Sequence, residues 1–207
     1  KDVSIFSNPI IENVFEMGSI MKPLTMASGL DDGVVTAETE YNDKGFLVLN
    51  GAKISNYDGK GRGKVNMQEV LNQSLNTGAS FIVSKLGNKK FADYMKNFGL
   101  GEETGIDLPN ESVGIIDNLE SPRDLEYATA SFGQGIAISP ITTVRALSTL
   151  SNGGLLVTPH IVKKVEYKNG LSKTIRGETD KRVIKKETSD EITRMLVEVV
   201  DSALLGG

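Results

Sequence analysis

The chain has 207 residues, of which 39% are apolar, and 27 acidic residues against 23 basic ones give a formal charge of −4. This length and composition allow one hydrophobic core, so we expect a single domain. The charge argues against nucleic-acid binding, and no run of Lys and Arg predicts a polybasic membrane patch.

Two residue types limit the chemistry further. The chain contains no cysteine, which excludes disulfides and thiolate metal sites. His160 is the single histidine, so neither a Ser-His-Asp triad nor a multi-histidine zinc site is expected, and we interpret it as a structural residue. Any serine chemistry must therefore use another base.

The ends of the chain indicate an excerpt. No stretch of 18 apolar residues is present, and the chain begins at Lys1 without the basic and apolar regions of a signal peptide. It has no initiator methionine and ends at Gly207 without a polar tail. We therefore expect it to be part of a longer protein.

In chain order, the first predicted element is a helix over residues 19–30, which ends near Gly29 or Gly33. Pro23 fits this helix because the first turn has no intrahelical acceptor for its amide groups. Residues 34–57 are rich in β-branched and aromatic residues separated by turn residues, which predicts short strands.

The middle third of the chain is predicted to be a compact helical block. It follows the glycine-rich segment 58–63, which matches neither phosphate-loop template and is interpreted as a surface turn. Asn66 and Glu69 form a capping box for a short helix that stops before Ser74. Two more helices are expected at residues 78–86 and 91–98, each closed by the glycine that follows.

The last third mixes helices and strands. Residues 101–122 predict an extended surface connection, and Ser139-Pro140 begins a helix that runs to Leu150. Thr188 and Glu191 are interpreted as a capping box for a final helix. Short strands are predicted at residues 155–157, 161–167 and 182–184.

The first candidate catalytic pair is Ser19 and Lys22. Three positions apart at a helix start, both side chains point to one face. Lysine can take the serine proton only if burial and the positive helix end disfavour its ammonium form, and the same end offers the Ser19 amide as an oxyanion donor. The pattern alone is weak, because Ser-x-x-Lys occurs by chance about once in such a chain. A solvated lysine near a capping serine is the simpler interpretation.

A second cluster, Ser74-Leu75-Asn76, lies at the break between two predicted helices. Ser and Asn are common at helix ends as caps, which is the simpler interpretation. A hydroxyl and an amide close to Ser19 and Lys22 would instead relay a proton and hold a substrate amide.

The combination of these motifs resembles a known family. Ser-x-x-Lys, Ser-x-Asn and Lys-Thr-Gly in that order mark penicillin-binding proteins and serine β-lactamases, and this chain has the first two. Residues 16–23 resemble the nucleophile segment of class B transpeptidases, with Met17 where proline is usual. Residues 104–109 and the stretch from 132 to 140 resemble two more segments of that family. From about Asn8 to its end, the chain resembles a class B penicillin-binding protein, a monofunctional D,D-transpeptidase of the penicillin-binding protein 2 or cell-division type.

The resemblance implies a role for each candidate residue. Ser19 would be acylated by the D-Ala-D-Ala end of a peptidoglycan stem peptide, or by penicillin as its mimic, and Lys22 would be the base. Ser74 would pass the proton to the leaving group, while Asn76 would orient the substrate amide and Lys22. A neighbouring stem-peptide amine would then form the cell-wall cross-link, with no metal or organic cofactor.

The resemblance also implies a mixed α/β fold, with a helical subdomain packed on a sheet subdomain and the site in the cleft between them. The third family motif, Lys-Thr-Gly, is absent, and Lys173-Thr174-Ile175 is misplaced and lacks the glycine. In the family that motif follows the helix assigned here to residues 189–202. We therefore expect residues 1–207 to be a transpeptidase domain truncated before that strand, with an incomplete sheet whose unpaired edge favours self-association.

A non-catalytic module with the same fold, a β-lactam sensor or an envelope scaffold, is the alternative. A stop codon after Gly207 favours this alternative, whereas a following Lys-Thr-Gly favours the enzyme. A β-lactamase is less favoured because residues 104–109 and 132–140 resemble transpeptidases. The family further implies a membrane anchor, an extracytoplasmic location and other cell-wall synthesis proteins as partners.

Overall fold

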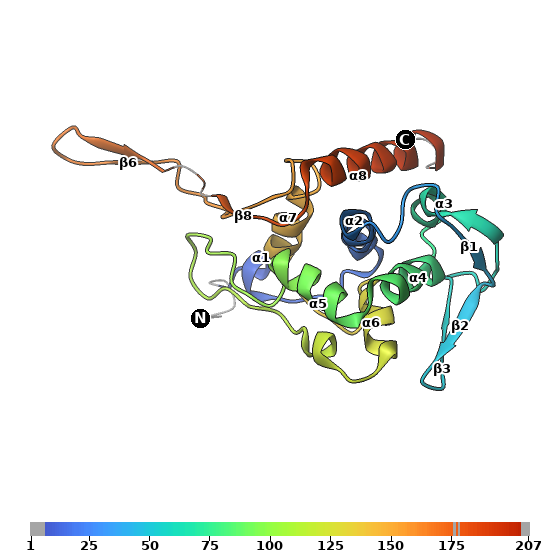
Figure 1. Cartoon of the computed structure of the whole chain (residues 1–207). Coiled ribbons are helices and arrows are strands. Elements are labelled where there is room, and N and C mark those ends of the chain that lie inside the picture. The colour runs from blue at the N-terminus through green and yellow to red at the C-terminus, as the bar shows by residue number, and fades with distance from the viewer. Residues whose placement is uncertain (1–6, 176, 178, 204–207) are drawn as a thin grey trace.

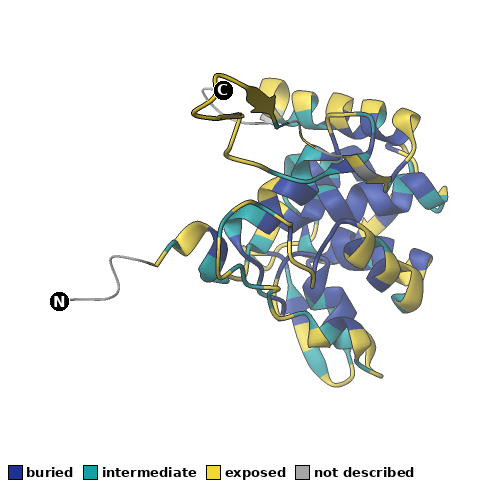
Figure 2. Ribbon diagram, turned by 90° about the vertical axis from the view of Figure 1, so that its left-hand side faces the viewer, coloured by how far each residue is buried: buried dark blue, intermediate teal, exposed yellow. Residues whose placement is uncertain are grey.

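Helix α2 (Lys22–Asp32) lies at the centre of the molecule in the computed structural model, which describes residues 7–203 except 176 and 178 (Figure 1). Leu24, Met26 and Ala27 of α2 are fully buried, as expected of a helix enclosed on all sides. Figure 2 shows the buried residues gathered in the middle of the helical body. The helices packed around α2 are α4 (Asn76–Leu86), α5 (Asn88–Asn97), α7 (Pro140–Ser148) and α8 (Lys186–Glu198).

Shorter helical elements connect this central group. They are α1 (Pro9–Glu12), the 3₁₀ turn η2 (Gly18–Met21), α3 (Met67–Asn72), the 3₁₀ turn η3 (Asp117–Glu120), α6 (Asp124–Ala130) and the π turn η4 (Val199–Ala203). The main buried cluster contains side chains from α2, α3, α4, α5, α7 and α8. The helical block predicted for the middle of the chain is therefore confirmed, and it packs against elements from both ends of the described residues.

The described strands form four separate antiparallel pairs. These pairs are β1 (Glu40–Asp43) with β4 (Gly63–Asn66), β2 (Phe46–Leu49) with β3 (Ala52–Ser55), β5 (Leu155–Val157) with β8 (Thr179–Arg182), and β6 (Lys164–Glu166) with β7 (Ser172–Thr174). The mixture of helices and strands confirms the predicted fold class. The strands expected within residues 34–57 are present, whereas β4 and β7 were not predicted. The strand predicted at residues 182–184 lies instead at β8, residues 179–182.

Of the three predicted N-caps, two agree with the structure and one does not. Asn66 accepts the Glu69 amide at 3.0 Å, and Ser139 accepts the Thr142 amide at 3.3 Å, so both are caps as predicted. The Glu69 carboxylate accepts from the side chains of Asn72 and Gln73, so only the Asn66 half of the predicted capping box is seen. Thr188 is not a cap, which corrects the prediction. Its hydroxyl donates to Asp31 Oδ1 at 2.8 Å, and α8 has already begun at Lys186.

The connection at residues 101–122 is extended over the surface as predicted, apart from η3. Within it, Asp107 accepts the amides of Ile161 and Val162 at 2.7 and 2.9 Å. These bonds fix the base of the β6–β7 hairpin, which projects from the body of the molecule (Figure 1). Among the described residues, no helix combines the length and the apolarity needed to cross a bilayer.

Candidate active site

The turn η2 places Ser19 directly before α2, so that Ser19 and Lys22 face each other across one turn. Ser19 is exposed, whereas Lys22 is 3% exposed. Lys22 Nζ lies 3.1 Å from Ser19 Oγ, within hydrogen-bond distance. The structure thus joins an accessible hydroxyl to a buried amine.

A second segment holds the turn that carries Ser19. The Gly18 amide donates to the Gly133 carbonyl at 3.2 Å, and the Gly135 amide donates to Glu16 Oε1 at 2.8 Å. A Cβ at Gly133, which has φ of +79°, would lie 2.2 Å from the Gly18 carbonyl oxygen. Only glycine allows this approach. In the sequence this stretch contributed only to the family resemblance, and its support of the turn carrying Ser19 was not predicted, although its repeated glycines are typical of close backbone contact.

Ser74 lies on the loop between α3 and α4 and contacts Lys22. Lys22 Nζ lies 2.8 Å from Ser74 Oγ and 2.5 Å from the Ser74 carbonyl oxygen. Ser74 has φ of +51°, a left-handed conformation that is uncommon for a residue with a side chain. This conformation directs both of its oxygens to the amine. Residues separated by 52 positions in the sequence therefore meet at Lys22.

The environment of Lys22 shifts its protonation toward the neutral amine. Burial lowers the pKa of Lys22 from 10.5 to about 8 because the ammonium form loses hydration. Within the described part of the chain, no carboxylate forms an ion pair with Lys22. A neutral amine has a free lone pair, so it can accept the Ser19 proton.

Asn76 lies at the first position of α4, close to Ser74 in sequence. Its Nδ2 donates to the Ser55 carbonyl of β3 at 2.9 Å. The described structure shows no hydrogen bond between Asn76 and Lys22, so the implied direct orientation of Lys22 by Asn76 is not seen. The structure instead joins Ser19 and Ser74 through Lys22, and anchors Asn76 to Ser55 of β3.

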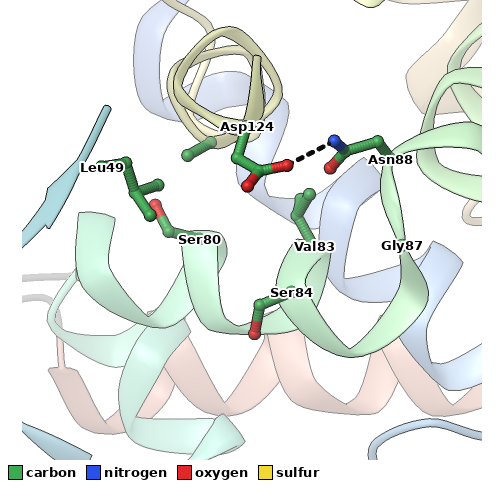
Figure 3. A pocket seen from close by; sticks show the side chains of 8 residues that line it. Leu49, Ser80, Val83, Ser84, Gly87, Asn88 and Asp124 are labelled. Carbon is green, nitrogen blue, oxygen red and sulfur yellow. Dashed lines mark hydrogen bonds between the residues drawn. The ribbon is translucent and has the colours of Figure 1, made fainter. Parts of the chain in front are cut away.

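Two cavities of the described structure lie outside this group. A cavity of about 340 Å³ between α4, α5 and α6 is drawn in Figure 3, and its charged residue Asp124 already accepts a hydrogen bond from Asn88 at 2.7 Å. A larger apolar groove of about 720 Å³ runs from Ile20 along α7 and α8. None of the four candidate site residues lines either cavity.

The described residues contain no group of three or more His, Cys, Asp or Glu side chains that could hold a metal ion. A serine hydroxyl beside a buried amine is an arrangement suited to acyl transfer through a covalent serine intermediate. The fold and the site together thus indicate the active-site-serine class.

Comparison with known proteins identifies the family. The penicillin-binding protein transpeptidase domain matches residues 1–205. Stage V sporulation protein D of Bacillus subtilis is 36% identical over 205 residues, which cover 96% of this chain and 31% of that protein. The probable peptidoglycan D,D-transpeptidase FtsI of Caulobacter vibrioides is 30% identical and covers 91% of this chain and 30% of its own length.

Solved structures agree with this match. The transpeptidase domain of Burkholderia pseudomallei penicillin-binding protein 3 superimposes with a TM-score of 0.82 and 30% identity, and covers 96% of this chain and 57% of that chain. This chain belongs to the penicillin-binding protein transpeptidase domain family. The predicted family and fold are thereby confirmed, and the chain spans about 31% of the length of its relative from Bacillus subtilis.

Proposed function

We propose that this chain is part of a peptidoglycan D,D-transpeptidase in which Ser19 is the nucleophile and Lys22 its base. The observation that carries the proposal is the double contact of Lys22 Nζ, 3.1 Å from Ser19 Oγ and 2.8 Å from Ser74 Oγ. Relatives named as peptidoglycan D,D-transpeptidases, such as MrdA of Acinetobacter baumannii at 27% identity over 205 residues, support the substrate class.

The reaction follows from these contacts. Neutral Lys22 takes the proton of Ser19 while Oγ attacks the carbonyl between the two D-alanines of a stem peptide. The C–N bond breaks, and Ser74, already hydrogen bonded to the amine, passes the proton to the departing D-alanine. The amine of a second stem peptide then attacks the ester, regenerates Ser19 and leaves a cross-link. Penicillin follows the first half and stays bound as an ester.

The remaining roles extend the same proposal. The Ser19 amide at the start of the helix donates to the oxyanion that forms during attack. Asn76, held by Ser55, presents its carboxamide to the substrate amide. We further propose that the protein acts at the extracytoplasmic face of the cell membrane together with other cell-wall synthesis proteins, as its family relatives suggest.

Labelling with fluorescent penicillin tests the proposal. A chain extended past residue 207 to include a Lys-Thr-Gly strand is expected to gain covalent label at Ser19, located by mass spectrometry, whereas Ser19→Ala gains none. The 207-residue chain has no Lys-Thr-Gly motif and therefore no second oxyanion donor, so we expect it to label at least about 10²-fold more slowly. No label on the extended chain would refute the enzyme and favour a scaffold, whereas label without transpeptidation would favour a β-lactam sensor.

A further inference from the structure

Asp43, at the end of β1, is a buried carboxylate outside the groups discussed so far. It is 2% exposed and accepts five hydrogen bonds. The donors are the backbone amides of Gly45 and Arg62, the Asn56 side-chain amide through both carboxylate oxygens, and the Thr77 hydroxyl. A buried carboxylate is tolerated only when its oxygens are satisfied in this way. The cluster therefore makes a rigid support.

This support holds the first turn of α4. The N-cap of α4 is Leu75, whose side chain cannot accept a hydrogen bond from the free amide groups of that turn. Asn56 replaces it, since its Oδ1 accepts the Thr77 amide at 3.3 Å. Thr77 Oγ1 in turn donates to Asp43 at 2.8 Å. The cap is thus supplied by residues that precede Thr77 by 21 and 34 positions.

The same segment fixes Asn76, two residues after Ser74. Ser55, next to Asn56, accepts the Asn76 side-chain amide at 2.9 Å. Ser74 is held on its other side by the end of α3, where its amide donates to the Leu71 carbonyl at 3.1 Å. A left-handed serine persists only when both flanks are held, because its backbone is strained. Figure 1 shows β1 and β3 on the same side of the molecule as α3, and both strands contact α4.

We propose that Asp43 and Asn56 are positioning residues that act through Thr77: they lock the start of α4 and so hold Ser74 and Asn76 in register with Lys22. This inference rests on the proposed acyl-transfer function. Neither residue contacts Lys22 or Ser19, so their effect on the reaction is indirect. Without the support from Asp43 and Asn56, Ser74 moves away from Lys22. Proton transfer between Lys22 and Ser74 is then weakened, and water reaches the Lys22 amine.

Thr77→Val is the sharpest test because it keeps the shape of Thr77 and removes only the hydroxyl. Tyr94→Phe is the matched control, since Tyr94 also donates a hydroxyl at 2.8 Å to a carboxylate, that of Asp31. Asp31 lies at the other end of α2, about 13 Å along the helix from Lys22. Both variants remove a hydroxyl that donates to a carboxylate at 2.8 Å, and Thr77 Oγ1 also lies 3.1 Å from Tyr41 Oη and 3.2 Å from Asn56 Oδ1. Only Thr77→Val acts on the site.

The assay is the second-order rate of penicillin acylation, measured against pH in the protein at its natural length. Thr77→Val is expected to lower the rate at least about tenfold and to move the midpoint of the pH profile upward. Thr77→Ser, which restores the hydroxyl, is expected to recover most of the rate. Tyr94→Phe is expected to lower the melting temperature without changing the rate or the midpoint.

Three outcomes would overturn the inference. Thr77→Val could react like the wild type, Tyr94→Phe could lose as much rate as Thr77→Val, or Thr77→Ser could fail to recover. A wild-type protein that forms no acyl-enzyme overturns the proposed function and this inference with it. Hydrogen exchange gives a readout without activity: Asn56→Ala should speed exchange of the amides at residues 74–78, and unchanged protection there would also overturn the inference.

Discussion

At the nucleophile, the protonation state of Lys22 determines whether its amine donates a hydrogen bond to Ser19 or accepts one from it. As an ammonium, Lys22 has three protons and no lone pair, and its three neighbouring acceptors are Ser19 Oγ, Ser74 Oγ and the Ser74 carbonyl. As a neutral amine it can accept the Ser19 proton. Only the second arrangement produces a nucleophile, so the reaction depends on the pKa of Lys22.

The rate of acylation is therefore expected to rise with pH until about pH 8 and then to level off. The pKa of Lys22 is lowered to about 8, and below that value the neutral fraction falls about tenfold for each pH unit. A stopped-flow series of penicillin acylation from pH 5.5 to 9.5 measures the midpoint. A midpoint near the ordinary lysine value of 10.5 would contradict the assigned environment.

Lys22→Arg tests whether acylation needs only the positive charge of Lys22 or also its ability to accept a proton. Arginine keeps the positive charge but does not lose its proton in proteins, so we expect acylation to fall about 10²-fold to 10⁴-fold. Lys185→Arg is the control, because the Lys185 amine also donates to a backbone carbonyl, that of Asp31, at 2.7 Å. The control should acylate at the wild-type rate. Equal rates for all three proteins would exclude Lys22 as the base.

At the scale of elements, the contact between Gly133 and Gly18 fixes the turn that presents Ser19. Gly133→Ala introduces a Cβ 2.2 Å from the Gly18 carbonyl oxygen at a φ of +79°. Gly170→Ala is the matched control, since Gly170 has φ of +84° and no atom within 4 Å of its Cβ position. The backbone strain, about 1–2 kcal/mol, is shared by both variants. The collision is confined to Gly133.

Differential scanning calorimetry distinguishes the two effects. Gly170→Ala is expected to lower the melting temperature by about 2–8 °C, and Gly133→Ala by clearly more. Gly133→Ala should also slow acylation, because the displaced turn carries Ser19, while Gly170→Ala should not. Equal melting temperatures and equal rates would mean that the Gly18–Gly133 contact is not tight in solution.

The elements that the sequence predicts well are those whose signals are local. Asn66 and Ser139 each cap an amide three residues ahead, so their patterns are visible in the sequence. The start of α8 cannot be recognised in the sequence, because the residue that accepts the Lys185 amide there, Asp31, is 154 positions away. The start of α4 has the same property, since its cap comes from Asn56.

The site shows the same division between local and distant signals. Ser19 and Lys22 lie three positions apart, so their contact follows from helix geometry alone. The approach of Ser74 depends on the loop between α3 and α4 and was expected only through the family resemblance. The supports at Gly133 and Asp43 join distant segments by backbone contact and buried hydrogen bonds, for which the sequence offers no spacing rule.

For the molecule as a whole, the main exposed feature is the apolar groove beside the site. The groove is lined mainly by Ile20, Pro23, Leu147, Leu150, Leu196, Val197 and Val200. Ile20 is 50% exposed and Val197 is 53% exposed, although a continuous apolar surface of this kind is normally covered. The sequence predicts self-association through an unpaired strand edge, and the structure presents this groove as a further apolar surface for it.

We expect the 207-residue chain to self-associate as its concentration rises, with two copies covering each other's groove. Multi-angle light scattering over a concentration series measures the mass. Val197→Lys places a charge in the groove and should shift the chain toward monomer, whereas Val144→Lys, at a valine that is 62% exposed on α7 but does not line the groove, should not. A constant monomer mass, or equal effects of both substitutions, would show that the groove does not hold copies together. Because Ile20 follows Ser19 directly, association through the groove should also slow penicillin labelling as the protein concentration rises.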